Sequence, residues 1–189
     1  MKEINYIVSG LERSGTSMMM QILKAGNIPI AYDTQRKPDE NNPKGYYELS
    51  NGLIIRELMD GKFLLDKYKG KFIKITSYGI SFLPKSNYKI IYLERDIEEI
   101  LDSMEKMIRK VDMDRDMTRD TFSKLNEYIK KYMERRNDMD VLILNYNQII
   151  KNKEKEIKKI LDFLDLNDTH LTDMILSIDN TLYRQRNND

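Results

Sequence analysis

Six residues of the segment GLERSGTS, residues 10–17, have the types and the spacing of a phosphate-binding loop. A short apolar run over residues 4–9 precedes the segment, and helical periodicity follows it over residues 17–25. A glycine-rich turn between a strand and a helix directs backbone N–H groups into one concavity, and the helix N-terminus adds partial positive charge. The sequence therefore predicts phosphate binding by Gly10, Arg13, Ser14, Gly15, Thr16 and Ser17. The alternative is a strand-to-helix turn whose glycines are accidental.

The loop lacks the lysine of P-loops that hydrolyse ATP or GTP. In those loops the lysine precedes the final Ser or Thr and reaches the β- and γ-phosphates. Thr16 occupies this position here, and the cation of the loop is Arg13 instead. A donor without a γ-phosphate needs neither that lysine nor, necessarily, Mg²⁺. We therefore expect a nucleotide without a γ-phosphate and no bound metal.

A second phosphate-binding pair follows the most strongly apolar segment of the chain, residues 88–94. Arg95 ends this predicted strand, and Ser103 lies eight positions further on, in the helix that is predicted to follow. Eight residues span about two helical turns, so Ser103 lies on roughly the same face as the first turn. Arg95 can then make a charge-assisted contact to a phosphate to which Ser103 also donates. The alternative is that Arg95 pairs with Asp96 or Glu99 at the surface.

These features resemble the sulfotransferase family, whose members use 3′-phosphoadenosine 5′-phosphosulfate (PAPS) as donor. The loop is similar to the family's 5′-phosphosulfate loop, G-x-x-R-S-G-T-S/T, with Glu12 in place of the usual proline. Arg95 and Ser103 have the spacing of the family's 3′-phosphate site. The segment NPKGYYE, residues 42–48, resembles the NPxGYxE segment of a bacterial branch of the family.

The resemblance continues to the end of the chain. Residues 141–166 are similar to the family's closing strand, tyrosine turn and following helix, and TLYRQR, residues 181–186, is similar to a tail segment of the bacterial branch. The motifs follow one another in the family's order from residue 4 to about residue 186. The resemblance implies a P-loop fold, PAPS as donor, and a small-molecule, carbohydrate or peptide acceptor.

Sulfuryl transfer requires a base for the acceptor's proton and cations for the leaving oxygen. The resemblance implies Glu48 as base, since carbohydrate and protein-tyrosine sulfotransferases use a glutamate, and Arg13 and Lys74 as the cations. Alternatively, Glu48 caps the following helix or pairs with Arg13 or Lys44, and Lys74 is solvated on a strand face. His170, the single histidine, lies far downstream and is expected to be structural or on the surface.

The spacing of apolar residues predicts alternating strands and helices. The expected strands are residues 4–9, 28–32, 71–76, 88–94 and 141–146, and the expected helices are residues 17–25, 50–61, 96–110, 115–136 and 152–166. Such alternation indicates parallel βαβ units with helices on both faces of a sheet. We therefore expect one α/β domain over residues 1–189, a three-layer P-loop fold with a central parallel sheet.

Composition excludes several classes of function. The 189 residues include 32 basic and 31 acidic side chains, a net charge of +1 that does not favour a nucleic-acid partner. The absence of cysteine excludes disulfides and thiolate chemistry. No apolar run approaches the length of a membrane span, and the N-terminus has no signal-peptide pattern. These features predict a cytoplasmic protein without a membrane partner, and they leave the oligomeric state open.

Two other functions remain at this point. One is a nucleotide kinase or NTPase with a degenerate phosphate loop, in which Glu94 is the acid on the metal side and the lid arginines are Arg109, Arg115 and Arg119. The other is a nucleotide-binding module without catalysis. Residues 109–120 are interpreted as a lid or acceptor-side loop, or else as a solvated turn. Arg184 either reaches the 3′-phosphate or is solvated.

Overall fold

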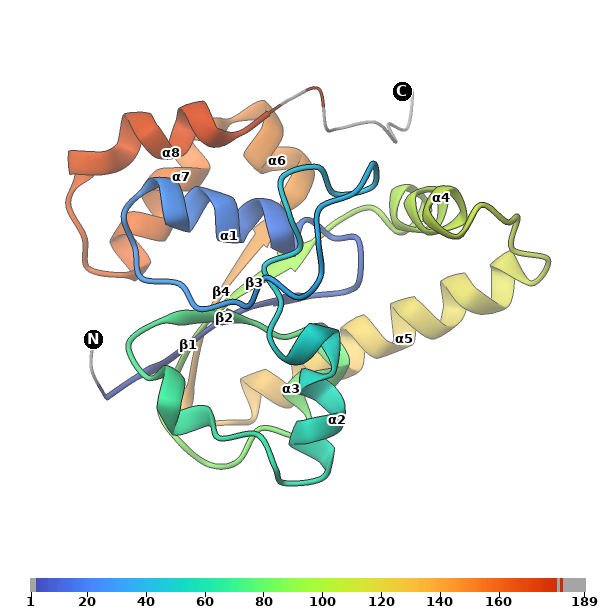
Figure 1. The fold of residues 1–189 in the computed structure, drawn as a ribbon, viewed down its shortest axis with the longest axis horizontal. Helices are drawn as coiled ribbons and strands as arrows, with labels where there is room; N and C mark the ends of the chain where they lie inside the picture. The colour runs from blue at the N-terminus through green and yellow to red at the C-terminus, as the bar shows by residue number, and fades with distance from the viewer. Residues whose placement is uncertain (1–2, 180, 182–189) are drawn as a thin grey trace.

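The computed structural model describes residues 3–179 and residue 181 of the chain. Figure 1 shows a central sheet with helices on both faces, and with α4 (Ile97–Ile108) and α5 (Arg115–Glu134) extending to one side. The expected α/β architecture with a parallel central sheet is therefore confirmed. Within the described part of the chain, no helix combines the length and the apolar character needed to cross a bilayer.

The sheet has four parallel strands in the order β2-β1-β3-β4. Their bounds are β1 (Asn5–Gly10), β2 (Phe72–Lys74), β3 (Tyr88–Glu94) and β4 (Met139–Asn145). The strands β2 and β3 lie on opposite sides of β1, so the winding of the chain reverses there. Open α/β sheets bind ligands at the carboxyl ends of the strands beside such a point. Gly10 pairs with Leu93, so the phosphate loop and Arg95 leave the sheet next to each other.

The remaining helices form a layer on each face of the sheet (Figure 1). One layer contains α1 (Thr16–Ala25), α6 (Tyr146–Lys151), α7 (Lys153–Phe163) and α8 (Leu171–Ser177). The other contains α2 (Ile54–Met59), α3 (Ser77–Ile80) and the C-terminal part of α5. Short 3₁₀ helices in the described part of the chain cover Ser50–Gly52, Leu65–Tyr68 and Asp168–His170.

Alternating side chains of β1 divide the hydrophobic core into two clusters. Tyr6 and Val8 belong to the cluster under α1, α7 and α8, whereas Ile7 belongs to the cluster under α2, α3 and α5. Successive side chains of a strand point to opposite faces, so a central strand that is buried throughout, as β1 is, needs a helical layer on each side. The three-layer arrangement follows from this requirement.

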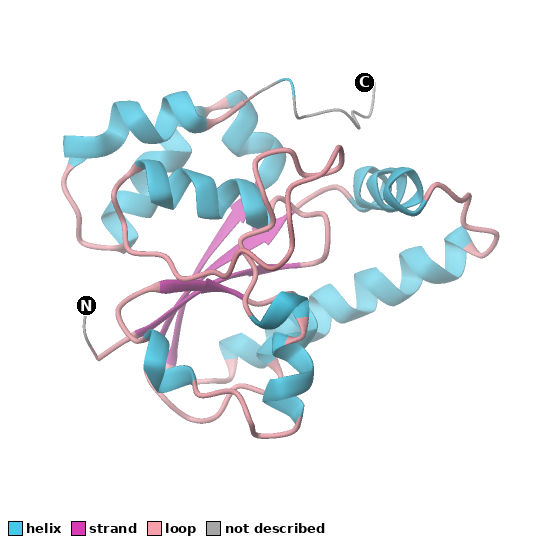
Figure 2. Ribbon diagram, in the orientation of Figure 1, coloured by secondary structure: helices cyan, strands magenta, loops and turns pink. Residues whose placement is uncertain are grey.

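The prediction of a strand over residues 28–32 is wrong. Ile30 makes a single bridge to Phe72, and the chain then leaves the sheet. Pro29 accepts a hydrogen bond from the Phe72 backbone but has no N–H to donate, so the ladder cannot extend before this pair. After it, the backbone N–H of Asp33 donates to the carbonyl of Glu48 and not to β2. Figure 2 shows a long, mostly irregular segment between α1 and α2, and this segment supplies one wall of the site described below.

Two other expected elements differ in detail. The helix predicted over residues 50–61 is broken into a 3₁₀ turn and α2, because Ser50 and Asn51 have φ values of 53° and 51° in the left-handed region. The strand predicted over residues 141–146 is not fully buried, since β4 is the edge of the sheet and Ile143 is 43% exposed.

Candidate functional site

The phosphate loop follows a tight path that only glycine can take at its two ends. Gly10 has φ 147°, and a Cβ there would lie 2.4 Å from the carbonyl oxygen of Leu93. Gly15 has φ 101°, and a Cβ there would lie 2.3 Å from Cδ2 of Tyr146. Arg13 also has a positive φ of 66°. The backbone therefore curls between β1 and α1, as a loop that surrounds an anion must do.

Three hydroxyl groups line or support this loop. The Ser14 hydroxyl is buried and has no hydrogen-bond partner among the described residues. Thr16 begins α1, which has no side-chain cap and no acidic residue in its first turn. Ser17 donates to the carbonyl of Tyr46 at 3.1 Å and accepts from Asn42 at 3.0 Å. The helix N-terminus therefore keeps its backbone N–H groups and its partial positive charge for a ligand.

Arg13, Arg95 and Ser103 are brought together beside the loop. Arg13 donates from Nε to Oγ of Ser103 at 2.9 Å, and Arg95 donates from Nη1 to the Arg13 carbonyl at 3.1 Å. Burial lowers the pKa of Arg13, although a guanidinium remains charged at neutral pH. Arg95 also pairs with Glu99 at 2.8 Å and lies over the ring of Tyr146, 4.5 Å from its centroid. The pairing of Arg95 with Glu99 that the sequence left open is thus present, but both side chains are buried.

Glu48 and Lys74 form the second half of the site. Lys74 Nζ lies 3.0 Å from Oε1 of Glu48 and 3.2 Å from Oγ of Ser17, and it also donates to the carbonyl of Tyr46. Burial lowers the pKa of Lys74, and the charge of Glu48 opposes this shift. The other oxygen of Glu48, Oε2, accepts from Arg36 at 3.0 Å. Lys74 is therefore a buried cation between the phosphate loop and a carboxylate, and not a solvated residue of a strand face.

Most of these groups line one cavity of about 300 Å³. Those predicted from the sequence are Arg13, Gly15, Thr16, Ser17, Glu48, Lys74, Arg95 and Ser103. Gly10 and Ser14 shape the loop behind it. The structure thus brings the predicted residues together, and it leaves their individual roles as predictions.

Sequence reasoning missed several residues of this cavity, namely Arg36, Asn42, Lys106 and Tyr146. Lys106 had a signal, because it lies three positions after Ser103 and shares its helical face. Tyr146 follows β4 directly, at the same carboxyl edge as the other site residues, and was expected only as part of the family's tyrosine turn. Asn42 also had a signal, because it begins the NPKGYYE segment. Arg36 had none, because an irregular segment has no periodicity from which contacts can be inferred.

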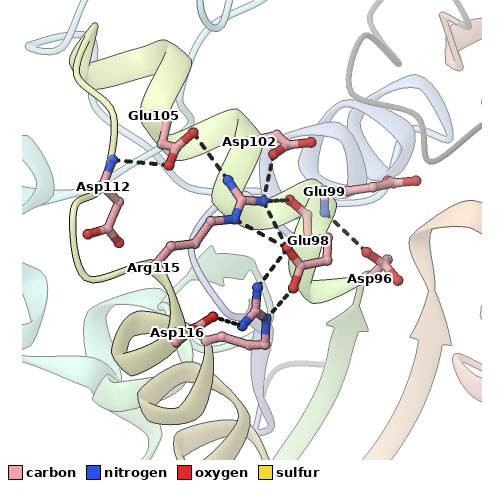
Figure 3. A network of polar contacts seen from close by, with 9 residues as sticks. Asp96, Glu98, Glu99, Asp102, Glu105, Asp112, Arg115 and Asp116 are labelled. Atoms are coloured by element: carbon pink, nitrogen blue, oxygen red, sulfur yellow. Dashed lines mark hydrogen bonds and ion pairs between the residues drawn. The ribbon is translucent and has the colours of Figure 1, made fainter.

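The arginines proposed as a kinase lid lie elsewhere. Figure 3 shows Arg115 surrounded by Glu98, Asp102 and Glu105 of α4, at 2.9, 2.7 and 3.1 Å. Arg119 pairs with Glu98 and Asp116, and Arg109 pairs with Glu40. Residues 109–120 are therefore a turn and the start of α5, held to α4 by ion pairs.

Other predicted groups are also outside the site. Glu94 pairs with Lys130 at 2.7 Å, and His170, whose side chain is 42% exposed, ends a 3₁₀ turn. Arg184 lies outside the described residues. Within residues 3–179 and at residue 181, no three acidic or histidine side chains form a group that could hold a metal ion.

Comparison with known proteins places the fold in a family. The model of the sulfotransferase domain family matches residues 3–186. Mouse sulfotransferase SULT7A1 complexed with PAP, the desulfonated donor, has a TM-score of 0.59 and 19% identity over 96% of this chain and 66% of that one. Sulfotransferase STF9 from Mycobacterium avium has a TM-score of 0.58 and 14% identity over 96% of this chain and 68% of that one. No curated protein sequence matches the chain.

A parallel α/β sheet with a phosphate loop at its switch point defines a nucleotide-binding protein of the P-loop class. The chain belongs to the sulfotransferase domain family, because the family match covers nearly its whole length. At these identities the likeness to solved structures shows the fold alone. The chain spans about two thirds of the length of these solved relatives.

Proposed function

We propose that this chain is a sulfotransferase that moves a sulfuryl group from PAPS to a hydroxyl or amine acceptor. The observation that carries the proposal is the meeting of two groups in one cavity: Arg13, Arg95 and Ser103 at the phosphate loop, and Glu48 with Lys74 next to it. Two solved relatives of this fold, mouse SULT7A1 and a retinol dehydratase, contain PAP. Family membership and the geometry support the same chemistry.

The residues present fit PAPS. The uncapped N-terminus of α1 and the curl of the backbone at Gly15 provide N–H donors and space for the 5′-phosphosulfate. Arg95 and Ser103 would hold the 3′-phosphate, with Lys106 as a further cation on the same helical face. When bound, PAPS supplies an activated sulfuryl group whose phosphate is the leaving group. No metal is needed for this assignment, because arginine and lysine supply the positive charge.

The roles of the reacting side chains follow from their contacts. In the proposed reaction Glu48 accepts the acceptor's proton, and this is supported by Lys74, which lies between Glu48 and Ser17 of the loop. Once Glu48 holds a proton, its ion pair with Lys74 weakens, and the ammonium is free to stabilise charge on the leaving oxygen. Arg13, in the loop itself, adds a second cation there. Proton acceptance and leaving-group stabilisation are thus coupled through one 3.0 Å contact.

The other two functions make different predictions. A nucleotide kinase needs mobile cations over a γ-phosphate, whereas Arg115 and Arg119 are held by acids of α4. A binding module without catalysis would keep the affinity for PAP and lack turnover. The test is the release of PAP from PAPS with a panel of phenol, alcohol and amine acceptors. Turnover that Glu48→Gln removes supports the proposal, and equal turnover in that variant contradicts the role of Glu48.

A further inference from the structure

We infer that the acceptor is an alcohol or phenol that also carries an oxyanion, such as a carboxylate, sulfate or phosphate group, and that Arg36 binds this oxyanion. The inference rests on the proposed function and adds the substrate class to it. Its basis is the state of Glu48, which is in ion pairs through both carboxylate oxygens.

Glu48 must release one of its partners before it can act as a base. Oε1 lies 3.0 Å from Nζ of Lys74, and Oε2 lies 3.0 Å from Nη1 of Arg36. A general base has to come within hydrogen-bond distance of the hydroxyl whose proton it takes. An acceptor hydroxyl therefore has to displace either Lys74 or Arg36 from the carboxylate.

Arg36 is the partner that can move. The Lys74 side chain is 5% exposed and is held from two further sides, by Ser17 and by the carbonyl of Tyr46. The Arg36 side chain is 41% exposed, and its other contact among the described residues is the ring of Tyr46, 3.4 Å from the guanidinium carbon to the centroid. Stacking on a ring leaves the edge N–H groups of a guanidinium available to exchange partners.

Only an anionic group can replace the ion pair that Arg36 makes with Glu48. A guanidinium binds carboxylate, sulfate and phosphate oxygens through paired charge-assisted hydrogen bonds, whereas a neutral acceptor would leave Arg36 on Glu48. Ile54 and Ile55 line the same cavity as Arg36, so we expect the body of the acceptor to be apolar. The sulfonate of the donor is the other anionic group that Arg36 could bind. We assign Arg36 to the acceptor because Lys74, and not Arg36, contacts the phosphate loop.

Binding of the acceptor would then activate the base. The oxyanion takes Arg36, and Oε2 of Glu48 becomes available to the hydroxyl. In the transfer itself the acceptor oxygen forms a bond to sulfur and its proton passes to Glu48. The bond between sulfur and the 5′-phosphate oxygen breaks, and its electron pair stays on that oxygen. An acceptor without the oxyanion leaves the base occupied.

The test compares phenols and alcohols that carry a carboxylate with the same compounds as neutral amides, for example 4-hydroxyphenylacetate and 4-hydroxyphenylacetamide. Binding is measured by calorimetry with and without saturating PAP. We expect the protein to prefer the carboxylate form about tenfold, the size of one charge-assisted contact. Arg36→Ala should abolish the preference. Lys37→Ala, a change at the exposed neighbouring cation, should retain it.

Glu48→Gln separates this role from a merely structural one. Because Glu48 competes with the acceptor's oxyanion for Arg36, its removal should tighten carboxylate binding, and Arg36→Ala in the same protein should cancel the gain. Equal binding of both forms, binding of neither, or a preference that survives Arg36→Ala overturns the inference. The inference is also overturned if Arg36→Ala lowers the affinity for PAPS but not for PAP, since Arg36 would then bind the sulfonate of the donor. Failure to bind PAP contradicts the proposed function, and the titrations without PAP still test Arg36.

Discussion

Arg13 of the phosphate loop donates a hydrogen bond to Ser103 of α4 at 2.9 Å, although the two residues are 90 positions apart in the sequence. One is expected to bind the 5′-phosphosulfate and the other the 3′-phosphate, so the two halves of the donor site share a contact before any ligand binds. The position of α4 therefore sets the geometry of the loop, and a substitution in α4 or in the loop should change ligand binding by both.

Ser103→Ala should weaken PAP binding with little effect on folding. The hydroxyl is the acceptor for Arg13 and the proposed donor to the 3′-phosphate, so we expect a loss of affinity of about tenfold. Titration calorimetry measures this, and Thr121→Ala, on the exposed side of α5, is the matched control. Unchanged PAP affinity in Ser103→Ala would remove the serine from the donor site.

Glu48→Gln and Lys74→Met should act as one unit in turnover. Each substitution should lower the rate constant for transfer by about 100-fold or more while the affinity for PAP changes little. The reason is that the contact between Glu48 and Lys74 stabilises the transition state. If proton acceptance and leaving-group stabilisation are coupled through the Glu48–Lys74 pair, the double variant should lose far less than the product of the single losses. Strictly multiplicative losses would show that the two residues act independently.

Gly15→Ala should destabilise the fold as well as the site. Its Cβ would lie 2.3 Å from the ring of Tyr146 at a φ of 101°, so strain and overpacking should together cost about 2–4 kcal/mol. Gly61→Ala is the control, since Gly61 also has a positive φ, of 65°, but has no atom within 4 Å of the added Cβ. That variant should lose only about 1 kcal/mol. Urea unfolding measures both, and equal losses would mean that the loop can shift away from Tyr146.

The ion pairs between α4 and α5 should make stability depend on acid pH. Hydrogen bonds from Arg119 and Arg115 lower the pKa of Glu98 from 4.5 to about 2. A carboxyl with a lowered folded-state pKa contributes stability above pH 4.5 and loses it as the pH falls toward 2. The effect should be small, since Glu98 is 37% exposed and solvent screens it.

Arg115→Ala removes part of this contribution. The difference in the free energy of unfolding between the natural chain and this variant should therefore shrink as the pH falls from 4.5 to about 2. Urea unfolding at a series of pH values measures it, with Arg56→Ala on α2 as a control whose difference should stay constant. A constant difference for Arg115→Ala as well would show that the pairs in Figure 3 do not contribute to stability.

Local patterns in the sequence were enough to predict the parallel sheet, and they also indicate the phosphate loop and the pair Arg95 and Ser103, whose binding roles stay predictions. Each depends on a strand, a helix or a glycine turn whose geometry fixes where its side chains point. Glu48 and Lys74 were predicted from a family resemblance, and the structure adds that they touch. Arg36 was not predictable, because its position depends on how an irregular segment returns over Tyr46.

The errors have local physical causes too. The segment over residues 28–32 is apolar like a strand, but Pro29 cannot continue the ladder. Positive φ values at Ser50 and Asn51 break a helix that hydrophobic periodicity alone predicts as continuous. In both cases a backbone constraint, which periodicity does not report, decides the structure.

Binding of a nucleotide by its 3′- and 5′-phosphates in this cavity can be tested with one calorimetric experiment. PAP, AMP and ATP with Mg²⁺ are titrated into the protein under the same conditions. We predict that PAP binds at least about 100-fold more tightly than AMP, since AMP lacks the phosphate assigned to Arg95 and Ser103. ATP with Mg²⁺ should bind no better than AMP. Equal affinity for PAP and AMP, or a preference for ATP with Mg²⁺, would contradict the account.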